Sequence, residues 1–333
     1  MGFRKFIRNI RKAFRRNAWS ELDALREQID LQNKQIHLQN EQIYLQDEQI
    51  HLLKRQHEEE SACIVPLLSY VEILYRSEAA GVLGKPRIMS VEDTLKEIAT
   101  TQKSLIRYGE GELQPIDGGR ALFQCPNERL GARLAEILQT DREDIVVCIQ
   151  NCLWFWPEKQ LTRTQWDWWF MNRPRIRQIA ERYLLKNRIY GETSVTHLYG
   201  SSVGSEDKDY SSLYTTWRQV WHDKDIVVIC GDRVFNKLEY NVFDNASSIE
   251  YLYVPTCDAF EEYDEIYARA RAVALHKLIV IMAGPTATVL AYDLTVNDGR
   301  RALDVGHLAK DYDCWKRQLT KQDEALITFW DAD

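Results

Sequence analysis

The chain has 333 residues, of which 45% are apolar, so it is long enough to bury a sizeable core. Its formal net charge is −7, but residues 1–18 hold seven Lys and Arg residues and no acidic residue, which leaves −14 for the remainder. Because nucleic acid is a polyanion, a body this acidic disfavours it, and we expect no nucleic-acid partner.

The cysteines and the hydropathy pattern both predict a cytoplasmic protein. The seven cysteines are odd in number and lie mostly in apolar stretches. Cys148 and Cys152 lack the second pair that a zinc site usually needs, so reduced, buried thiols are expected. The sequence contains no run of 18 continuous apolar residues, the length needed to span a membrane. The N-terminus also lacks the apolar core of a secretion signal.

Residues 1–18 predict a basic amphipathic helix. Phe3, Phe6, Ile7, Ile10 and Phe14 recur at helical spacing on one face, while Lys and Arg fill the other. Such a helix can lie in the interface of an anionic membrane, which would place the protein peripherally on the inner face of the plasma membrane. The alternative is a cationic helix that docks onto the acidic body of the same or another subunit.

Residues 19–60 predict a coiled coil. A seven-residue pattern repeats four times, with Ile at 29, 36, 43 and 50 and Leu at 31, 38, 45 and 52. A two-residue step turns a helix by about 200°, so Ile and Leu cannot form one seam. Either Ile lines a seam that also contains Gln39 and Gln46, or both faces are apolar and the helix joins a larger bundle. We expect self-association, with its order left open.

Residues 61–333 predict a single α/β domain, with a helix over residues 61–80 and a linker over 81–86. Apolar strand-like runs then alternate with helical stretches. The predicted strands are 104–108, 145–149, 225–230, 249–254, 277–282 and 301–305, and the predicted helices are 91–101, 127–139, 173–186, 211–221, 259–274 and 286–297. This alternation favours a Rossmann-like, mostly parallel sheet with helices on both faces. No Gly-x-Gly-x-x-Gly motif is present, which disfavours a standard dinucleotide site.

The first candidate site is the run Arg107-Tyr-Gly109-Glu110-Gly-Glu112, which follows the first predicted strand of the alternating region. Carboxylates one residue apart at a strand end are expected to point toward the same edge of the sheet, where open α/β sheets bind ligands. Paired oxygen ligands suit Mg²⁺ or Mn²⁺ held jointly with a substrate's phosphates. The alternative is an ordinary acidic turn.

Two further candidates follow the last two predicted strands. At Gly284-Pro285-Thr286, a tight turn leads into a helix, with Pro285 in its first turn and Thr286 or Thr288 able to satisfy free backbone donors. A helix N-terminus of this kind binds phosphate, although a well-capped crossover helix has the same pattern. Asp304-Val-Gly-His307 also ends a strand, and His307 could ligate a metal, hydrogen-bond a phosphate or be purely structural.

The middle of the domain offers weaker candidates. Gly231 and Arg233 follow a strand, and Asn241 and Asp244 lie beyond the next loop. Arg233 could clamp a pyrophosphate, or it could be an ordinary surface residue. Pro255 ends another strand and leads into a helix.

Taken in order, these segments resemble the GT-D-fold glycosyltransferases, a bacterial family first described as a domain of unknown function. The resemblance covers residues 90–315 and is strongest in the C-terminal third. It rests on Gly284-Pro-Thr-Ala-Thr-Val-Leu-Ala-Tyr-Asp-Leu294, Asp304-Val-Gly-His307, Asp311-Tyr312, Phe243-Asp-Asn-Ala246, Ser248-Ile249 and Pro255 with Ala259-Phe260. Glu110-Gly-Glu112 stands in place of the family's Asp-x-Glu metal motif, with Glu110 replacing its aspartate. Asp258 stands where the family tends to have asparagine.

The resemblance implies a UDP-sugar-dependent transferase that moves a hexose such as glucose to a saccharide or glycoprotein acceptor in bacterial surface-glycan assembly. Glu110, Glu112 and His307 would be the catalytic and Mn²⁺- or Mg²⁺-binding residues. The donor would contact Arg107, Gly109, Gly231, Arg233, Asn241, Asp244, Pro255, Gly284, Pro285, Thr286 and Asp304. The alternative is a catalytically inactive nucleotide-sugar-binding or scaffold protein of a glycosylation complex.

Overall fold

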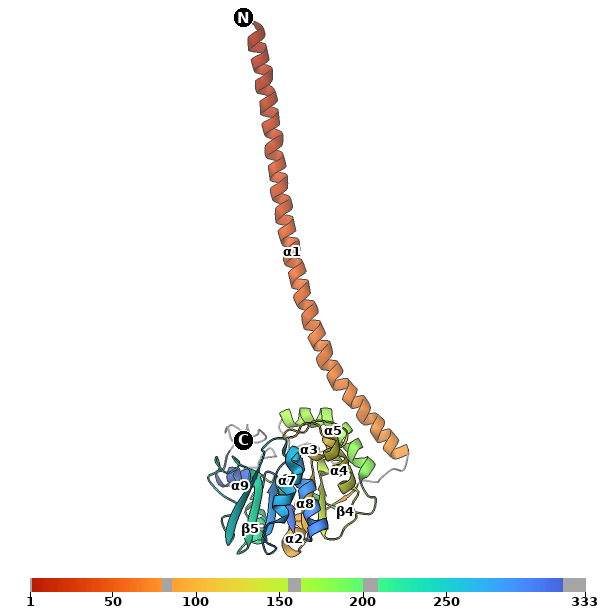
Figure 1. Ribbon diagram of the computed structural model, residues 1–333. Helices are drawn as coiled ribbons and strands as arrows, with labels where there is room; N and C mark the ends of the chain where they lie inside the picture. Colours follow the sequence, from red (N-terminus) through yellow and green to blue (C-terminus); the bar gives the residue numbers. More distant parts are fainter. Residues whose placement is uncertain (1, 80–85, 155–162, 200–208, 320–333) are drawn as a thin grey trace. The chain divides into compact units, whose positions relative to one another are not determined.

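The structure is a computed structural model that describes residues 2–79, 86–154, 163–199 and 209–319. The chain divides into two compact units, Met1–Val65 and Pro66–Asp333. The larger unit contains the sheet and is treated first (Figure 1).

The larger unit contains an eight-stranded sheet in the order β1-β4-β3-β2-β8-β7-β5-β6, and every strand pair is parallel. The strands are β1 (Arg87–Ile88), β2 (Ser104–Tyr108), β3 (Ile145–Ile149), β4 (Ile189–Glu192), β5 (Asp225–Gly231), β6 (Ser248–Val254), β7 (Leu278–Met282) and β8 (Ala302–Asp304). The helices that follow α1 are α2 (Val91–Thr100), α3 (Glu110–Ile116), α4 (Glu128–Leu138), α5 (Arg163–Tyr183), α6 (Ser211–Trp221), α7 (Tyr263–Arg271), α8 (Pro285–Asp298) and α9 (Leu308–Lys316).

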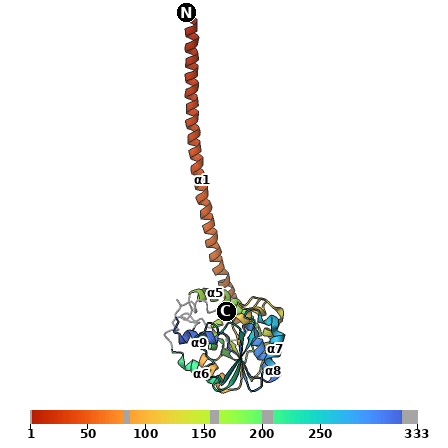
Figure 2. The ribbon, with the colours of Figure 1, turned by 60° about the vertical axis from the view of Figure 1, so that its left-hand side comes forward.

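Helices cover both faces of the sheet. Figure 2 shows α6 and α9 on one side of the strands and α7 and α8 on the other. Alternate residues of a strand point to opposite faces, so each central strand supplies both cores. In β7, Ile279 and Ile281 pack with α8, whereas Val280 packs with the aromatic core around Trp217 and Trp221 of α6. The predicted Rossmann-like parallel sheet is confirmed.

The strand order places a topological switch point near the middle of the sheet. From β2 the chain moves outward through β3 to β4, and then crosses to build the other half from β5 to β8. β2 and β8 therefore join the two halves, with Leu105 opposite Leu303. In open α/β sheets, the carboxyl edge beside such a point is where ligands bind.

Most predicted elements are present with shifts of a few residues at their ends, although α5 begins ten residues before the helix predicted at 173–186. The helices α3 and α9 and the strands β1 and β4 were not predicted. β4 has the sequence Ile-Tyr-Gly-Glu, which is short and contains glycine, and β1 spans two residues. Neither run is apolar enough to show strand periodicity on its own. Their place in the sheet depends on pairing with β3 and β4 respectively.

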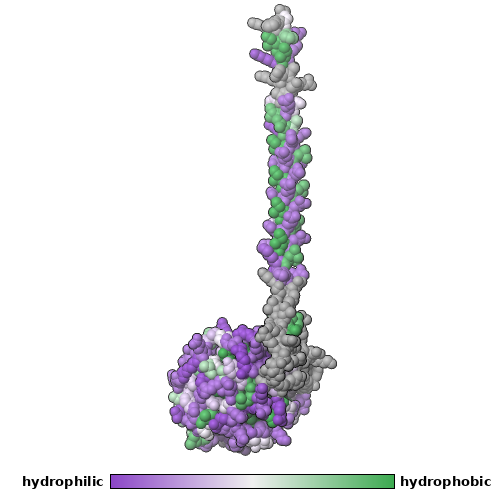
Figure 3. Space-filling view, turned by 90° about the vertical axis from the view of Figure 1, so that its right-hand side faces the viewer, coloured by the Kyte–Doolittle hydropathy of each residue, from purple (hydrophilic) through white to green (hydrophobic). Residues whose placement is uncertain are grey.

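The described residues of the first unit belong to α1 (Gly2–Ala79). Figure 3 shows apolar side chains running along this helix between hydrophilic ones. Phe6, Ile7 and Ile10 are exposed, whereas the side chains of Phe3 and Phe14 lie outside those described, as does the predicted linker apart from Pro86. Membrane attachment and self-association stay predictions. None of the helices described is apolar over a length that would cross a bilayer.

Candidate functional site

A cavity of about 670 Å³ opens at the carboxyl edge of the sheet, and residues at the ends of all eight strands line it. They include Met89 after β1, Glu110 after β2, Gln150 after β3, Glu192 of β4, Gly231 of β5, Pro255 after β6, Gly284 after β7 and His307 after β8. This volume lies within the range of small-ligand sites. The convergence follows from the parallel topology, since parallel strands all end at the same edge.

A buried ion pair joins the two halves of the sheet beneath this cavity. Arg107 Nη2 lies 2.9 Å from Asp304 Oδ1, and Arg107 Nε donates to the Asp304 carbonyl oxygen at 3.1 Å. Asp304 also accepts from Gly306 N–H and the Thr288 hydroxyl, so its carboxylate is well satisfied. Asp304 therefore orients Arg107, which lines the cavity, but does not line the cavity itself.

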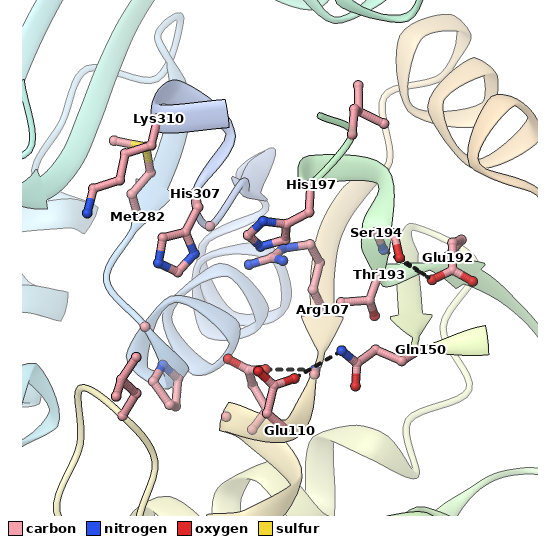
Figure 4. A pocket seen from close by; sticks show the side chains of 18 of the residues that line it. Arg107, Glu110, Gln150, Glu192, Thr193, Ser194, His197, Met282, His307 and Lys310 are labelled. Atoms are coloured by element: carbon pink, nitrogen blue, oxygen red, sulfur yellow. Dashed lines mark hydrogen bonds between the residues drawn. The ribbon is translucent and has the colours of Figure 1, made fainter. Parts of the chain in front are cut away.

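The predicted carboxylate pair begins a helix instead of ending a strand. Glu110 and Glu112 lie in the first turn of α3, where a two-residue step rotates side chains by about 200°. Both nevertheless line the cavity at the carboxyl edge, the edge toward which they were expected to point, and they differ in their hydrogen-bond partners. Glu110 Oε2 accepts from Gln150 Nε2 at 3.0 Å, while Glu112 Oε2 accepts from Gly109 N–H at 2.7 Å (Figure 4).

The environments of these two carboxylates differ. Glu110 is partly exposed, whereas Glu112 is buried and caps its own helix. Burial raises the pKa of Glu112 to about 7, against the opposing effect of the Arg107 charge. Both line the cavity, but Glu110 is the more accessible one, and one oxygen of Glu112 is already committed to Gly109.

Two histidines and a lysine lie on another side of the cavity (Figure 4). The rings of His197 and His307 are 5.1 Å apart between centroids, and Phe123 lies 5.7 Å from His307. Burial lowers the pKa of His307 to about 3, with Lys310 and Arg107 adding to the effect. Burial also lowers the pKa of His197 well below its usual value. Both imidazoles are therefore neutral at pH 7.

The predicted turn after β7 is present. Gly284 has φ +53° and ψ −144° at the N-cap of α8, and Pro285 occupies the first turn. Both line the cavity. Thr286 does not cap the helix: its hydroxyl is buried without a hydrogen-bond partner among the described residues, and Thr288 donates instead to the Arg107 carbonyl oxygen. The capping role expected of these threonines is therefore wrong.

The candidates from the middle of the domain separate into two groups. Gly231 and Pro255 line the cavity, and a side chain at Gly231 would meet the Thr256 hydroxyl. Arg233, Asn241 and Asp244 do not line it. Arg233 is exposed on the turn after β5, Asn241 accepts from Phe243 N–H, and Asp244 pairs with Arg218 at 2.5 Å. These three residues were predicted to contact the donor because they are close in sequence to the end of β5. The loop after β5 places them outside the cavity lining.

Sequence reasoning missed the residues contributed by β3 and β4. Gln150 and Asn151 directly follow a strand that was predicted, so the strand-end argument could have found them. Glu192 ends β4, and Thr193 and His197 follow it; because β4 lacks a strand pattern, no comparable signal existed.

Glu192 organises the segment after β4. Its carboxylate accepts from Asn151 N–H at 3.1 Å, Ser194 N–H at 3.1 Å and the Ser194 hydroxyl at 2.9 Å. Burial raises the pKa of this carboxyl group to about 7, even though these hydrogen bonds favour the charged form. Glu192 thus ties β3 to the segment that carries His197.

Over residues 2–79, 86–154, 163–199 and 209–319, no three His, Cys, Asp or Glu side chains come together as a complete metal site. Glu110 and the second oxygen of Glu112 remain suitable ligands for a hard cation that takes its other ligands from a phosphate-bearing substrate and water.

Removing Arg107 should be strongly destabilising. We expect Arg107→Met to lower the free energy of unfolding by about 3–5 kcal/mol, because the buried Asp304 charge loses its partner. Arg107→Met combined with Asp304→Asn should lose less than the sum of the two single changes. Urea denaturation gives the free energy of unfolding of Arg107→Met, Asp304→Asn and the double variant. Arg129→Met is the control, since the exposed Arg129–Asp264 pair contributes about 1 kcal/mol or less. Strict additivity would contradict a coupled pair.

Glu192 should make stability fall as pH rises. Its folded-state pKa of about 7 exceeds the ordinary 4.5, so the folded protein holds this proton more tightly than the unfolded chain does. The stabilisation is fully present below pH 4.5 and is lost as pH approaches 7, by up to about 3 kcal/mol. Between pH 4.5 and 7, the free energy of unfolding should fall less for Glu192→Gln than for wild type. The change Glu128→Gln at an exposed site should leave the decline as large as in wild type. Parallel profiles for wild type and Glu192→Gln would refute this.

Comparison with known proteins identifies relatives of this domain. The family profile described as glycosyltransferase GT-D fold matches residues 105–325. A probable glycosyl transferase, Gly, of Streptococcus gordonii is 30% identical over 68% of this chain and 32% of its own length. The glycosyltransferase GlyD of Streptococcus pneumoniae serotype 4 is 29% identical over 71% of this chain and 29% of its own. The chain thus spans about a third of the length of these curated relatives.

Solved structures also show similarity to glycosyltransferases of this fold. A glycosyltransferase (DUF1792) from Streptococcus sanguinis superposes with a TM-score of 0.64 and 28% identity, over 70% of this chain and 85% of that one. A structure of the domain of unknown function 1792, described as a distinct glycosyltransferase fold, superposes with a TM-score of 0.65 and 26% identity. The match covers 76% of this chain and 86% of that one. The predicted resemblance is therefore confirmed: this chain belongs to the GT-D-fold family of glycosyltransferases.

Proposed function

We propose that this protein transfers a hexose, such as glucose, from a UDP-sugar to a saccharide or glycoprotein acceptor, with the assistance of Mn²⁺ or Mg²⁺, in the assembly of a bacterial surface glycan. The observation that carries the proposal is the cavity at the carboxyl edge, where residues from every strand end meet beside the switch point. Family membership supports sugar transfer as the reaction class.

The polar groups of the cavity suit a nucleotide diphosphate. Arg107 supplies a permanent positive charge held in place by Asp304, and Lys310 lines the same cavity. His197 and His307 are neutral at pH 7 and can donate hydrogen bonds to phosphate oxygens without bringing two further charges into the site. Gly284 at the start of α8 adds the positive end of a helix dipole.

The carboxylates suit a divalent cation. Glu110 would be the main protein ligand, with the second oxygen of Glu112 beside it and the diphosphate completing the coordination. When bound, the metal offsets the negative charge that develops on the leaving UDP. Gln150 holds the Glu110 carboxylate in place, while Gly109 holds that of Glu112.

Glu110→Gln should reduce sugar transfer by about 10²-fold or more, because it removes the charge of the proposed metal ligand while conserving its shape. Glu110→Asp should retain more activity than Glu110→Gln, since the charge is kept. The measurement is UDP release and product formation with a panel of UDP-sugars and saccharide acceptors, with Mn²⁺ or with EDTA.

Asp244→Asn is the matched control, because Asp244 is an acidic residue of the same domain that does not line the cavity. Asp244→Asn should transfer sugar at the wild-type rate. Full activity of Glu110→Gln would refute the metal assignment. If UDP-sugar with Mn²⁺ raises the melting temperature of wild type but no acceptor yields product, the alternative of an inactive nucleotide-sugar-binding or scaffold protein is favoured.

A further inference from the structure

Residues 22–53 of α1 carry one regular seam that extends beyond the repeated heptads. Its positions are alternately three and four residues apart: Leu22, Leu25, Ile29, Gln32, Ile36, Gln39, Ile43, Gln46, Ile50 and Leu53. This spacing defines the a and d positions of a coiled coil, with Leu or Ile at every a position. We propose that this Leu22–Leu53 seam joins a second copy of the chain in a parallel, in-register, two-stranded coiled coil.

The apolar members of the seam are exposed in the single chain. Their exposed fractions run from 47% at Ile50 to 63% at Leu53. Exposed apolar side chains that recur along one side of a helix over this length mark an interaction surface, even though glutamines interrupt them. Because a long helix in water gains most of its stability from packing, this segment needs a partner along the seam.

The d positions determine the orientation of that partner. Leu25 and Leu53 flank three glutamines, Gln32, Gln39 and Gln46. In a parallel pair each Gln faces the same Gln of the other copy, so amide donors and acceptors can satisfy one another. An antiparallel pair would place Ile opposite Gln in the middle layers and leave buried amides unpaired, which costs free energy.

The same residues determine the register. Sliding one helix by seven residues would pair Leu25 with Gln32 at one end and Gln46 with Leu53 at the other. Both layers would then bury an amide against a leucine, whereas the in-register pair has none of these mismatches.

The flanking charges are compatible with pairing of identical chains. In a parallel pair, Glu21 of one copy lies beside Arg26 of the other, which is an attractive pair. Along the middle of the seam these flanks are amides, such as Gln35 and Asn40, so no like charges face each other there.

The leucine stripe at residues 31, 38, 45 and 52 supplies the matched control. It lies about 200° from the isoleucines, so a two-stranded coil does not bury it. Its members are somewhat more exposed than the apolar members of the seam, at 60–68%. If this stripe were the interface, or if both faces were used in a larger bundle, its replacement would alter the assembly.

The test is sedimentation equilibrium on the full chain, in wild type and two double variants. Wild type should sediment as a dimer. Ile36→Ser with Ile43→Ser should weaken dimerisation by more than about 100-fold, since each copy loses two buried side chains. Leu38→Ser with Leu45→Ser should leave the dimer unchanged. A monomeric wild type, an assembly larger than a dimer, or dissociation by the leucine changes alone would overturn the proposal.

Orientation and register are tested by oxidation of single cysteine substitutions against a wild-type background. Gln39→Cys at a d position should form a disulfide-linked dimer, whereas Glu41→Cys on the outer face of the helix should not exceed wild type. Equal cross-linking of the two, or none by Gln39→Cys, would overturn the parallel, in-register arrangement. Neither readout depends on sugar transfer, so a failure here is distinguishable from a failure of the proposed function.

Discussion

The buried pair between Arg107 and Asp304 is the interaction on which the ligand cavity depends. The two residues are 197 positions apart in the chain, yet they lie on adjacent strands that join the halves of the sheet. Taking an arginine and an aspartate out of water is costly unless each charge is matched and hydrogen-bonded. Asp304 satisfies this requirement through Arg107, Gly306 and Thr288 together.

The pair also explains the glycine at position 306. A Cβ atom there would collide with the Arg107 guanidinium, and its φ of +47° disfavours other residues. The chain can therefore turn tightly after β8 and present His307 at the cavity, close to His197. A structural ion pair and a ligand-facing histidine thus depend on the same short turn.

Polar groups around the cavity are held in place by neighbours of a different strand. Gln150 after β3 orients Glu110 after β2, and Glu192 of β4 accepts from Asn151 after β3. Such cross-strand support keeps a site organised before a ligand arrives, which reduces the cost of binding. It also means that no single strand end contains the site.

The sequence by itself determined the features that depend on local patterns. Apolar runs predicted β2 and β3 at their observed bounds, the Gly284-Pro285 turn predicted the start of α8, and the heptads predicted the helix of residues 19–60. Only the tertiary structure decided what depends on distant partners: the membership of β4 in the sheet, the meeting of His197 with His307, and the exclusion of Arg233, Asn241 and Asp244 from the cavity. Periodicity reports which face of an element is buried, but the neighbours of that face are set by strand order and loop paths.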